Sequence, residues 1–252
     1  MNAMALFHAD CPVAAREQRW IEESMAWLRG EFGDTYLRRP IILPANEFFP
    51  GPHDGSTASI RTIIDRLCGY ADVDPATLTI EYYGDSAEQD LARAARLTSR
   101  SRGAAGHYRR VGGRVVIGID RTLASAPERL IATVAHELGH VRLLGEGRIS
   151  SERADHEPLT DLFTVYCGLG IFSANARFDY REDGVRATTS NLGYLTEPMF
   201  GYGLACHAWL RGEPRPGWLR HVDTNPRAYA KRGLRYLAAN ADPGELPRPA
   251  SH

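Results

Sequence analysis

The first half of the chain carries the residue patterns of β-strands. Leu78–Tyr83 alternates apolar and polar residues over its first four positions, and Arg114–Asp120 is a short run rich in valine and isoleucine. Alternation predicts a strand with one buried face, and a short β-branched run predicts a buried strand. A third apolar segment, residues 40–43, also predicts a short strand. The sequence therefore predicts a small sheet built from the first half of the chain.

Helical spacing of apolar residues predicts most of the remaining structure. It marks a first helix, in which Trp20 and Trp27 lie seven positions apart, and it recurs through the second half of the chain. Thr196 and Asn225 are placed to cap the last two helices. Strands followed by a run of helices predict an α+β fold. The expected helices cover residues 13–31, 57–69, 87–97, 126–144, 158–172, 197–211 and 226–239. A flexible stretch is expected at 98–106, overlapping a solvated loop that extends over 99–110, and a polar loop is expected at 173–191.

Composition and charge narrow the class of protein. Of the 252 residues, 43% are hydrophobic and 24% are charged, which is typical of a globular chain. We expect a single domain over residues 1–240, with an N-terminal part up to about residue 105, a metal-binding part over 106–240 and a disordered, proline-rich tail at 241–252. The net charge of −1 gives no reason to expect nucleic acid or an anionic membrane as a partner.

The cysteines and the first residues indicate a reducing compartment. The four cysteines are far apart and none forms a CxxC pair, so neither a disulfide framework nor a cysteine-based zinc ribbon is expected. The first residues lack the basic and apolar regions of a signal peptide, and the longest apolar run is too short to span a bilayer. We therefore expect a cytoplasmic protein.

One short motif carries the chemistry, the sequence HELGH at residues 136–140. Ser125 is expected to cap the helix that contains it. His136 and His140 are four residues apart and share a helix face, far from the apolar residues of the same helix. Two imidazoles one turn apart can hold a single Zn²⁺, and Glu137 beside them is placed to take a proton from water.

The following helix offers a third ligand. A catalytic zinc site needs three protein ligands and an open position. Glu157 and Asp161 are four residues apart in the segment EPLTD, so on one helix they point the same way. The Glu157 carboxylate can complete the site, and Asp161 can accept the second N–H of a ligand histidine. His156, directly before Glu157, is an alternative ligand.

HELGH followed by an ExxxD helix resembles the zincin metallopeptidases, in particular the gluzincin branch that includes thermolysin-like enzymes. The resemblance covers about residues 114–172. It implies a zincin-like fold, with a small sheet packed on the metal-binding helix, and it implies that Arg114–Asp120 is an edge strand that binds peptide by β-addition. The flanking segments resemble uncharacterised bacterial HExxH proteins, a likeness that supplies no activity. The implied roles are ligation of one Zn²⁺ by His136, His140 and Glu157, general-base catalysis by Glu137, and orientation of a ligand histidine by Asp161.

These residues together predict a zinc metallopeptidase, a hydrolase that acts on a peptide or protein substrate. The metal would polarise the scissile carbonyl, and Glu137 would move a proton from water to the leaving amine. His207, His221 and Tyr194 are the candidates for a hydrogen bond to the developing oxyanion. Two alternatives remain open. One is a catalytically inactive metal-binding regulatory or interaction protein, which a fourth ligand such as His156 would favour, and the other is a metal-free helical scaffold.

Overall fold

The computed structural model describes residues 9–83, 106–111, 114–176 and 194–247 of the chain. Over these residues the fold is mixed α+β and mostly helical, which confirms the predicted class. The strands are β1 (Leu78–Tyr83), β2 (Gly106–Val111) and β3 (Arg114–Asp120). The helices are α1 (Ala15–Leu37), α2 (Thr57–Ala71), α4 (Pro127–His140), α5 (His156–Tyr166), α6 (Gly170–Ala176), α7 (Glu197–Leu210) and α8 (Thr224–Asn240). The helix predicted at 87–97 and most of the loop predicted at 173–191 lie outside the described residues.

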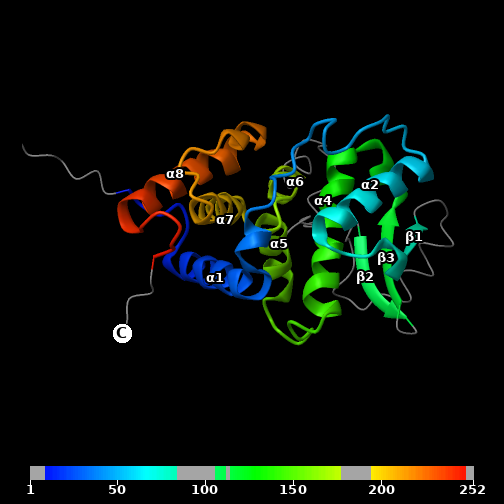
Figure 1. Cartoon of the computed structure of the whole chain (residues 1–252), viewed down its shortest axis with the longest axis horizontal. Coiled ribbons are helices and arrows are strands. Elements are labelled where there is room, and N and C mark those ends of the chain that lie inside the picture. Colours follow the sequence, from blue (N-terminus) through cyan, green and yellow to red (C-terminus); the bar gives the residue numbers. More distant parts are fainter. Residues whose placement is uncertain (1–8, 84–105, 112–113, 177–193, 248–252) are drawn as a thin grey trace, which may run out of the picture.

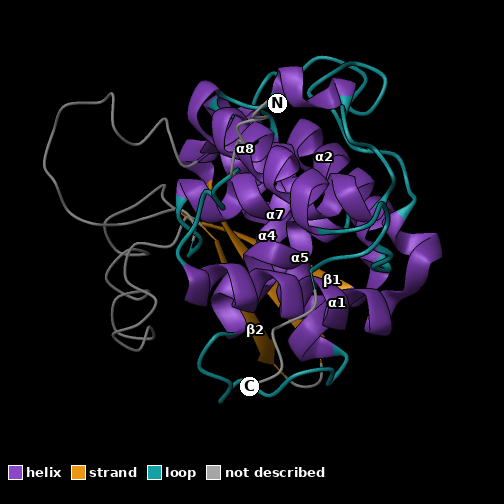
Figure 2. Ribbon diagram, turned by 90° about the vertical axis from the view of Figure 1, so that its left-hand side faces the viewer, coloured by secondary structure: helices purple, strands orange, loops and turns teal. Residues whose placement is uncertain are grey.

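The elements follow one another in layers. In Figure 1, α1, α7 and α8 gather at one end of the molecule, α5 and α6 come next, and α4 lies between them and the sheet. When the helical end faces the viewer, the strands lie behind the helices (Figure 2). Buried apolar side chains from each of these helices and from β1 and β3 form one continuous core. This core holds α5 between α1 and α4, which is the arrangement that the candidate site requires.

The sheet has the strand order β1-β3-β2, in which β3 pairs in parallel with β1 and antiparallel with β2. β1 and β3 confirm the two strands with the clearest sequence patterns. β2 lies where the sequence predicts a polar loop, because its residues show no apolar alternation. The central place of β3 makes the expectation of an edge strand at Arg114–Asp120 wrong, since both sides of β3 are already hydrogen-bonded. β2 is instead an edge of the described sheet, and it packs on α4.

The strand predicted at 40–43 is wrong, and its main chain is used differently. The Ile42 amide donates a hydrogen bond to the Gly168 carbonyl at 3.0 Å. Gly168 has a φ of 84°, and a Cβ at this position would lie 2.9 Å from the Pro40 oxygen, so both its conformation and its surroundings favour glycine. The same glycine follows the end of α5, which is why the single helix predicted over 158–172 is two helices, α5 and α6.

Two other helices end more than two residues away from the end that the sequence predicts. α1 passes the predicted end at residue 31 and continues to Leu37, with Gly33 in a non-helical conformation at φ 77° inside it. α4 ends at His140, and a π-helical turn, Val141–Gly145, follows directly. None of the helices in the described part of the chain combines the length and the apolar character needed to cross a membrane.

The structure confirms one of the three predicted helix caps. Thr196 Oγ1 accepts a hydrogen bond from an amide in the first turn of α7, at 3.4 Å. Ser125 instead donates to the Thr122 carbonyl, and Ala126 stands at the cap position of α4. Asn225 lies inside the first turn of α8. Serine and asparagine side chains bond readily to nearby main chain in several local geometries, so their presence before a helix does not fix a cap.

The segment after α8 is packed further than the sequence predicts. The Trp209 indole donates to the Asp242 carbonyl at 2.9 Å, and the Arg29 guanidinium donates to the Gly244 carbonyl at 3.1 Å. Leu246 packs against the core. These contacts place residues 242, 244 and 246 against the helical layer, and residues 248–252 lie outside the described part of the chain.

Candidate metal centre

The site begins with the close approach of α5 to α4. Gly139 lies within the HELGH motif, and a Cβ at this position would come 2.7 Å from Thr160 Cγ2 and 3.3 Å from Phe163 Cδ1. Only a residue without a side chain leaves room for α5 at this distance. His136 and His140 lie on the same side of α4, with ring centroids 4.7 Å apart and ring planes at 89°. The glycine between them thus allows a second helix to bring its side chains to both imidazoles.

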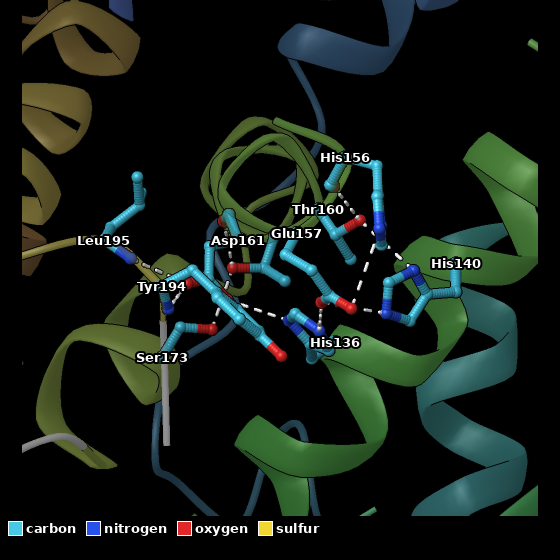
Figure 3. A network of polar contacts seen from close by, with 10 residues as sticks. His136, His140, His156, Glu157, Thr160, Asp161, Ser173, Tyr194 and Leu195 are labelled. Carbon is cyan, nitrogen blue, oxygen red and sulfur yellow. Dashed lines mark hydrogen bonds and ion pairs between the residues drawn. The ribbon is translucent and has the colours of Figure 1, made fainter. Parts of the chain in front are cut away.

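Glu157 joins the two histidines in one cluster (Figure 3). Its Oε2 lies 3.1 Å from His136 Nε2 and 3.3 Å from His140 Nε2. All three donor atoms lie within 4.8 Å of one another. In a tetrahedral zinc site, ligand atoms about 2.0–2.1 Å from the metal are about 3.3 Å from each other. The two measured separations match that value, and the donor set of two imidazoles and one carboxylate suits Zn²⁺.

Asp161 fixes the orientation of His136. Its Oδ1 lies 2.8 Å from His136 Nδ1, and its Oδ2 accepts hydrogen bonds from the amides of Tyr194 and Leu195 at 2.6 Å and 3.1 Å. The residue is only 3% exposed. Because a carboxylate only accepts, Nδ1 of His136 carries the proton and Nε2 faces Glu157. The main chain before α7 is therefore tied to the orientation of a candidate ligand.

Thr160 holds Nδ1 of the second histidine, His140, as Asp161 holds Nδ1 of His136. Its hydroxyl donates to the His156 carbonyl at 2.8 Å, and its oxygen lies 3.3 Å from His140 Nδ1. Since the single hydroxyl proton is used on His156, the His140 ring is the donor in the second contact. With the proton on Nδ1, Nε2 of His140 keeps a lone pair that a metal ion held beside Glu157 could use. Both imidazoles thus present the same ring nitrogen to the centre of the cluster, as shared ligation of one ion requires.

Glu137 lies beside this cluster with one oxygen unpaired. The residue is 4% exposed, and no hydrogen-bond partner reaches its buried Oε2 within the described structure. Burial raises the pKa of Glu137 to about 7, and nearby Glu157 raises it further while His136 opposes the shift. Buried carboxylate oxygens normally have partners. An unpaired one on a residue that feels the charges of His136 and Glu157 is the arrangement expected of a group that bonds to water or substrate.

The pKa values of the donors favour ligation at neutral and higher pH. Burial works against ionisation of Glu157, but its close contacts with His136 and His140 outweigh burial and hold the pKa of Glu157 well below its usual range. Burial lowers the pKa of His140, so this imidazole is neutral at neutral pH. For His136, burial is outweighed by the hydrogen bonds to Asp161 and Glu157, and its pKa is raised. A metal must therefore displace a proton from His136, which makes its affinity increase with pH.

The structure brings one of the three oxyanion candidates to the cluster. The Tyr194 ring stacks on the His136 ring, with centroids 5.9 Å apart and planes at 22°, and the residue is 53% exposed. Burial on its inner side, together with the charges of nearby carboxylates, raises the pKa of the Tyr194 phenol to about 12, so it is a hydrogen-bond donor at neutral pH. The phenol therefore stands at the accessible side of the cluster.

The structure does not bring the other two oxyanion candidates to the cluster. His207 is 1% exposed within α7 and packs against Tyr166, 6.2 Å between ring centroids. His221 ends a short 3₁₀ turn, Gly217–His221, and its Nε2 accepts a hydrogen bond from Arg220 at 3.1 Å. Both histidines thus serve packing or local contacts.

His156 lies near the cluster but outside the group of donor atoms. Its Nδ1 is 3.8 Å from the second oxygen of Glu157, and its ring centroid is 6.1 Å from that of His140. The donor group in the described part of the chain contains His136, His140 and Glu157 and does not include His156. Three protein ligands leave a fourth position open for a small molecule, as catalytic zinc sites require.

Sequence reasoning missed several groups around this site. Thr160 carries no motif of its own, although its place one turn before Thr164 and three residues after Glu157 puts it on the inward face of α5. The amides that hold Asp161 belong to main chain and have no side-chain signal. Tyr108 of β2, whose ring centroid is 5.8 Å from that of His140, lies in a strand that the sequence does not predict.

Comparison of the chain with models of known protein families, with curated proteins and with solved structures finds no match. The likeness to the zincins therefore depends on the HELGH and ExxxD motifs alone. What the chain does has to be argued from the geometry of the cluster.

Proposed function

We propose that the protein is a zinc-dependent peptidase with a zincin-like architecture. The proposal is carried by one observation, the convergence of His136, His140 and Glu157 from two helices into a donor group with zinc-like spacings. The unpaired carboxylate oxygen of Glu137 beside that group supports hydrolysis rather than metal storage. The packing of β2 on α4, with β2 antiparallel at the sheet edge, supports the zincin-like arrangement.

Each side chain has a separate task in this proposal. When bound, a zinc ion would supply Lewis acidity that polarises a scissile carbonyl and acidifies water. Glu137 accepts the proton of the attacking water and delivers it to the leaving amine. Its pKa of about 7, raised mainly by burial, suits both halves of that transfer near neutral pH. The Tyr194 phenol, a donor at neutral pH, is the group placed to hydrogen-bond the oxygen on which charge develops.

β2 offers the binding surface for an extended substrate. No described strand pairs with the side of β2 that faces away from β3. A strand at the edge of a sheet can accept an extended peptide as a further strand. Tyr108 lies between this strand and the cluster, since it belongs to β2 and contacts the His140 ring. We therefore propose that a peptide paired with β2 runs past the candidate donors and that the substrate is an extended peptide or unfolded protein.

The proposed enzyme acts in the cytoplasm. All four cysteines, Cys11, Cys68, Cys167 and Cys206, are free thiols in the structure. Free thiols persist in reducing compartments, whereas secreted proteins tend to oxidise them. The inactive metal-binding protein is the less favoured alternative, because the donor group has three protein ligands and His156 stands outside it.

Glu137→Gln tests the proposed function. We expect the variant to bind zinc as tightly as the wild type, because Glu137 is not among the donors, and to lose turnover by a factor of about 1,000 or more. Turnover is measured as cleavage of a mixture of unfolded peptides, read by mass spectrometry, with zinc content determined on the same samples. Equal cleavage by the variant and the wild type would remove Glu137 from the mechanism. A wild type that binds zinc but cleaves no peptide would favour the inactive metal-binding protein.

A further inference from the structure

A side chain from the N-terminal helix reaches the start of the helix that carries Glu157. The Trp20 indole of α1 donates a hydrogen bond to Asp155 Oδ2 at 2.7 Å, across 135 positions of sequence. Asp155 is the residue directly before α5, and Glu157 is the second residue of that helix. The bond therefore acts two residues from the third donor of the metal cluster.

Asp155 is built into the first turn of α5 by its main chain as well. Its carbonyl accepts the Leu159 amide at 3.0 Å, which is the first helical hydrogen bond to span Glu157. Its carboxylate also accepts two hydrogen bonds from Arg153, at 2.5 Å and 3.0 Å. Because the carboxylate is held from both sides, the backbone of the first turn has little freedom to rotate about it. The direction in which Glu157 leaves the helix depends on that backbone.

α1 also holds the rest of the connector between α4 and α5. The guanidinium of Arg153 lies 5.7 Å from the centre of the Trp27 ring. At the other end of the connector, Arg148 donates to the Glu31 carbonyl at 3.1 Å and lies 4.4 Å from the centre of the Phe32 ring. Figure 1 shows one end of α1 lying against the part of α5 from which this connector leaves. Contacts at both ends align the connector with one side of α1.

We infer that α1 positions the third metal ligand, with Trp20 as the positioning residue and the Asp155 carboxylate as the link. The inference rests on the proposed metal site and adds a determinant of metal affinity outside that site. His136 and His140 have their main chain in α4 and are oriented by Asp161 and Thr160, which lie beyond the first turn of α5, whereas Glu157 belongs to that first turn, which α1 holds. Loss of the indole N–H would leave the histidine pair in place and loosen only the carboxylate.

Trp20→Phe is the test, because phenylalanine keeps an aromatic ring on α1 and removes the N–H donor. Trp218→Phe is the matched control. The Trp218 indole also donates to a carboxylate, that of Glu213 at 2.8 Å, but in the turn after α7. Zinc affinity of the full chain is measured by competition with a chromophoric chelator. The visible absorption of the cobalt-loaded protein reports the coordination of the metal directly.

We expect Trp20→Phe to weaken zinc binding by about tenfold and to change the cobalt spectrum, because supporting contacts of metal ligands control affinity to this extent. Trp218→Phe should leave the zinc affinity and the cobalt spectrum unchanged, even if it lowers the thermal unfolding temperature as much as Trp20→Phe does. Equal zinc affinity and an unchanged cobalt spectrum in Trp20→Phe would overturn the inference and leave the proposed zinc site standing. A wild type that binds neither zinc nor cobalt would overturn both.

Discussion

Asp161→Asn is the substitution that most sharply separates orientation of a ligand from simple packing. The carboxylate accepts from one imidazole and from two main-chain amides, and it donates to none of them. Asparagine has one accepting oxygen and one donating nitrogen. If its nitrogen faces His136, the imidazole proton must move to Nε2, the atom that faces Glu157. If its nitrogen instead faces the amides of Tyr194 and Leu195, those two N–H groups face an N–H group and lose their acceptor. The main chain before α7 is then no longer held by residue 161.

The cost can be estimated from the bonds lost. A hydrogen bond to a charged group contributes about 1.5–3 kcal/mol. Either orientation of the asparagine amide loses at least one such bond, and therefore at least this much stabilisation. We expect the substitution to weaken zinc binding by about 10–100-fold, the range found when the partner of a ligand histidine is changed. A purely packing role predicts no such loss, because asparagine has the size and shape of aspartate.

The assay is zinc affinity by chelator competition, with Asp74→Asn as the control. Asp74 also accepts a main-chain amide, that of Ala76 at 2.9 Å, but it does so at the exposed start of the 3₁₀ turn Pro75–Thr77. The control variant should bind zinc as the wild type does. If Asp161→Asn also binds zinc within twofold of the wild type, the argument that Asp161 sets the imidazole tautomer is refuted.

Three further predictions follow from individual contacts. Gly139→Ala places a Cβ 2.7 Å from Thr160, so overpacking of about 1–3 kcal/mol should exceed the gain of about 1 kcal/mol in helix propensity; urea unfolding that shows the variant to be more stable would contradict this close approach. Tyr194→Phe should keep zinc affinity, because the ring that stacks on His136 remains, and should lower peptide turnover by about 100-fold; unchanged turnover would exclude the phenol as a donor. Burial lowers the pKa of His207 from 6.5 to about 3. Between these two pH values His207 is protonated in the unfolded chain and neutral in the folded chain, so the free energy of unfolding decreases as the pH falls from about 6.5 toward 3. Between pH 7 and pH 5 this loss is about 2 kcal/mol, and it should be missing from the urea unfolding of His207→Gln; an identical pH dependence in both proteins would contradict the assignment.

The grouping of His136, His140 and Glu157 is the part of the structure that follows most directly from the sequence. His136 and His140 share a face because both lie on one helix, and Glu157 and Asp161 share a face for the same reason. Spacing within a helix is a local property that the residue order determines directly. The meeting of the two helices is not local, but Gly139 between the histidines gives a physical reason why α5 can approach there.

Features that depend on distant or main-chain partners could not be predicted in the same way. β2 lies at an edge of the described sheet and is rich in polar residues, so it lacks the apolar pattern of a buried strand. Its pairing with β3 makes β3 the central strand of that sheet. The amides that hold Asp161 and the indole that holds Asp155 come from segments far along the chain. Local patterns report burial and periodicity, whereas such contacts are decided by how the whole chain packs.

X-ray absorption at the zinc edge of the reconstituted, full-length protein tests the central claim most directly. The proposed site predicts one zinc per chain with two imidazole nitrogens at about 2.0–2.1 Å, one carboxylate oxygen at about 2.0–2.2 Å and a further light atom from solvent. Glu157→Ala should lose the carboxylate contribution and retain both imidazoles. Sulfur scattering at about 2.3 Å, a single imidazole, or a spectrum unaffected by Glu157→Ala would contradict the proposed metal centre.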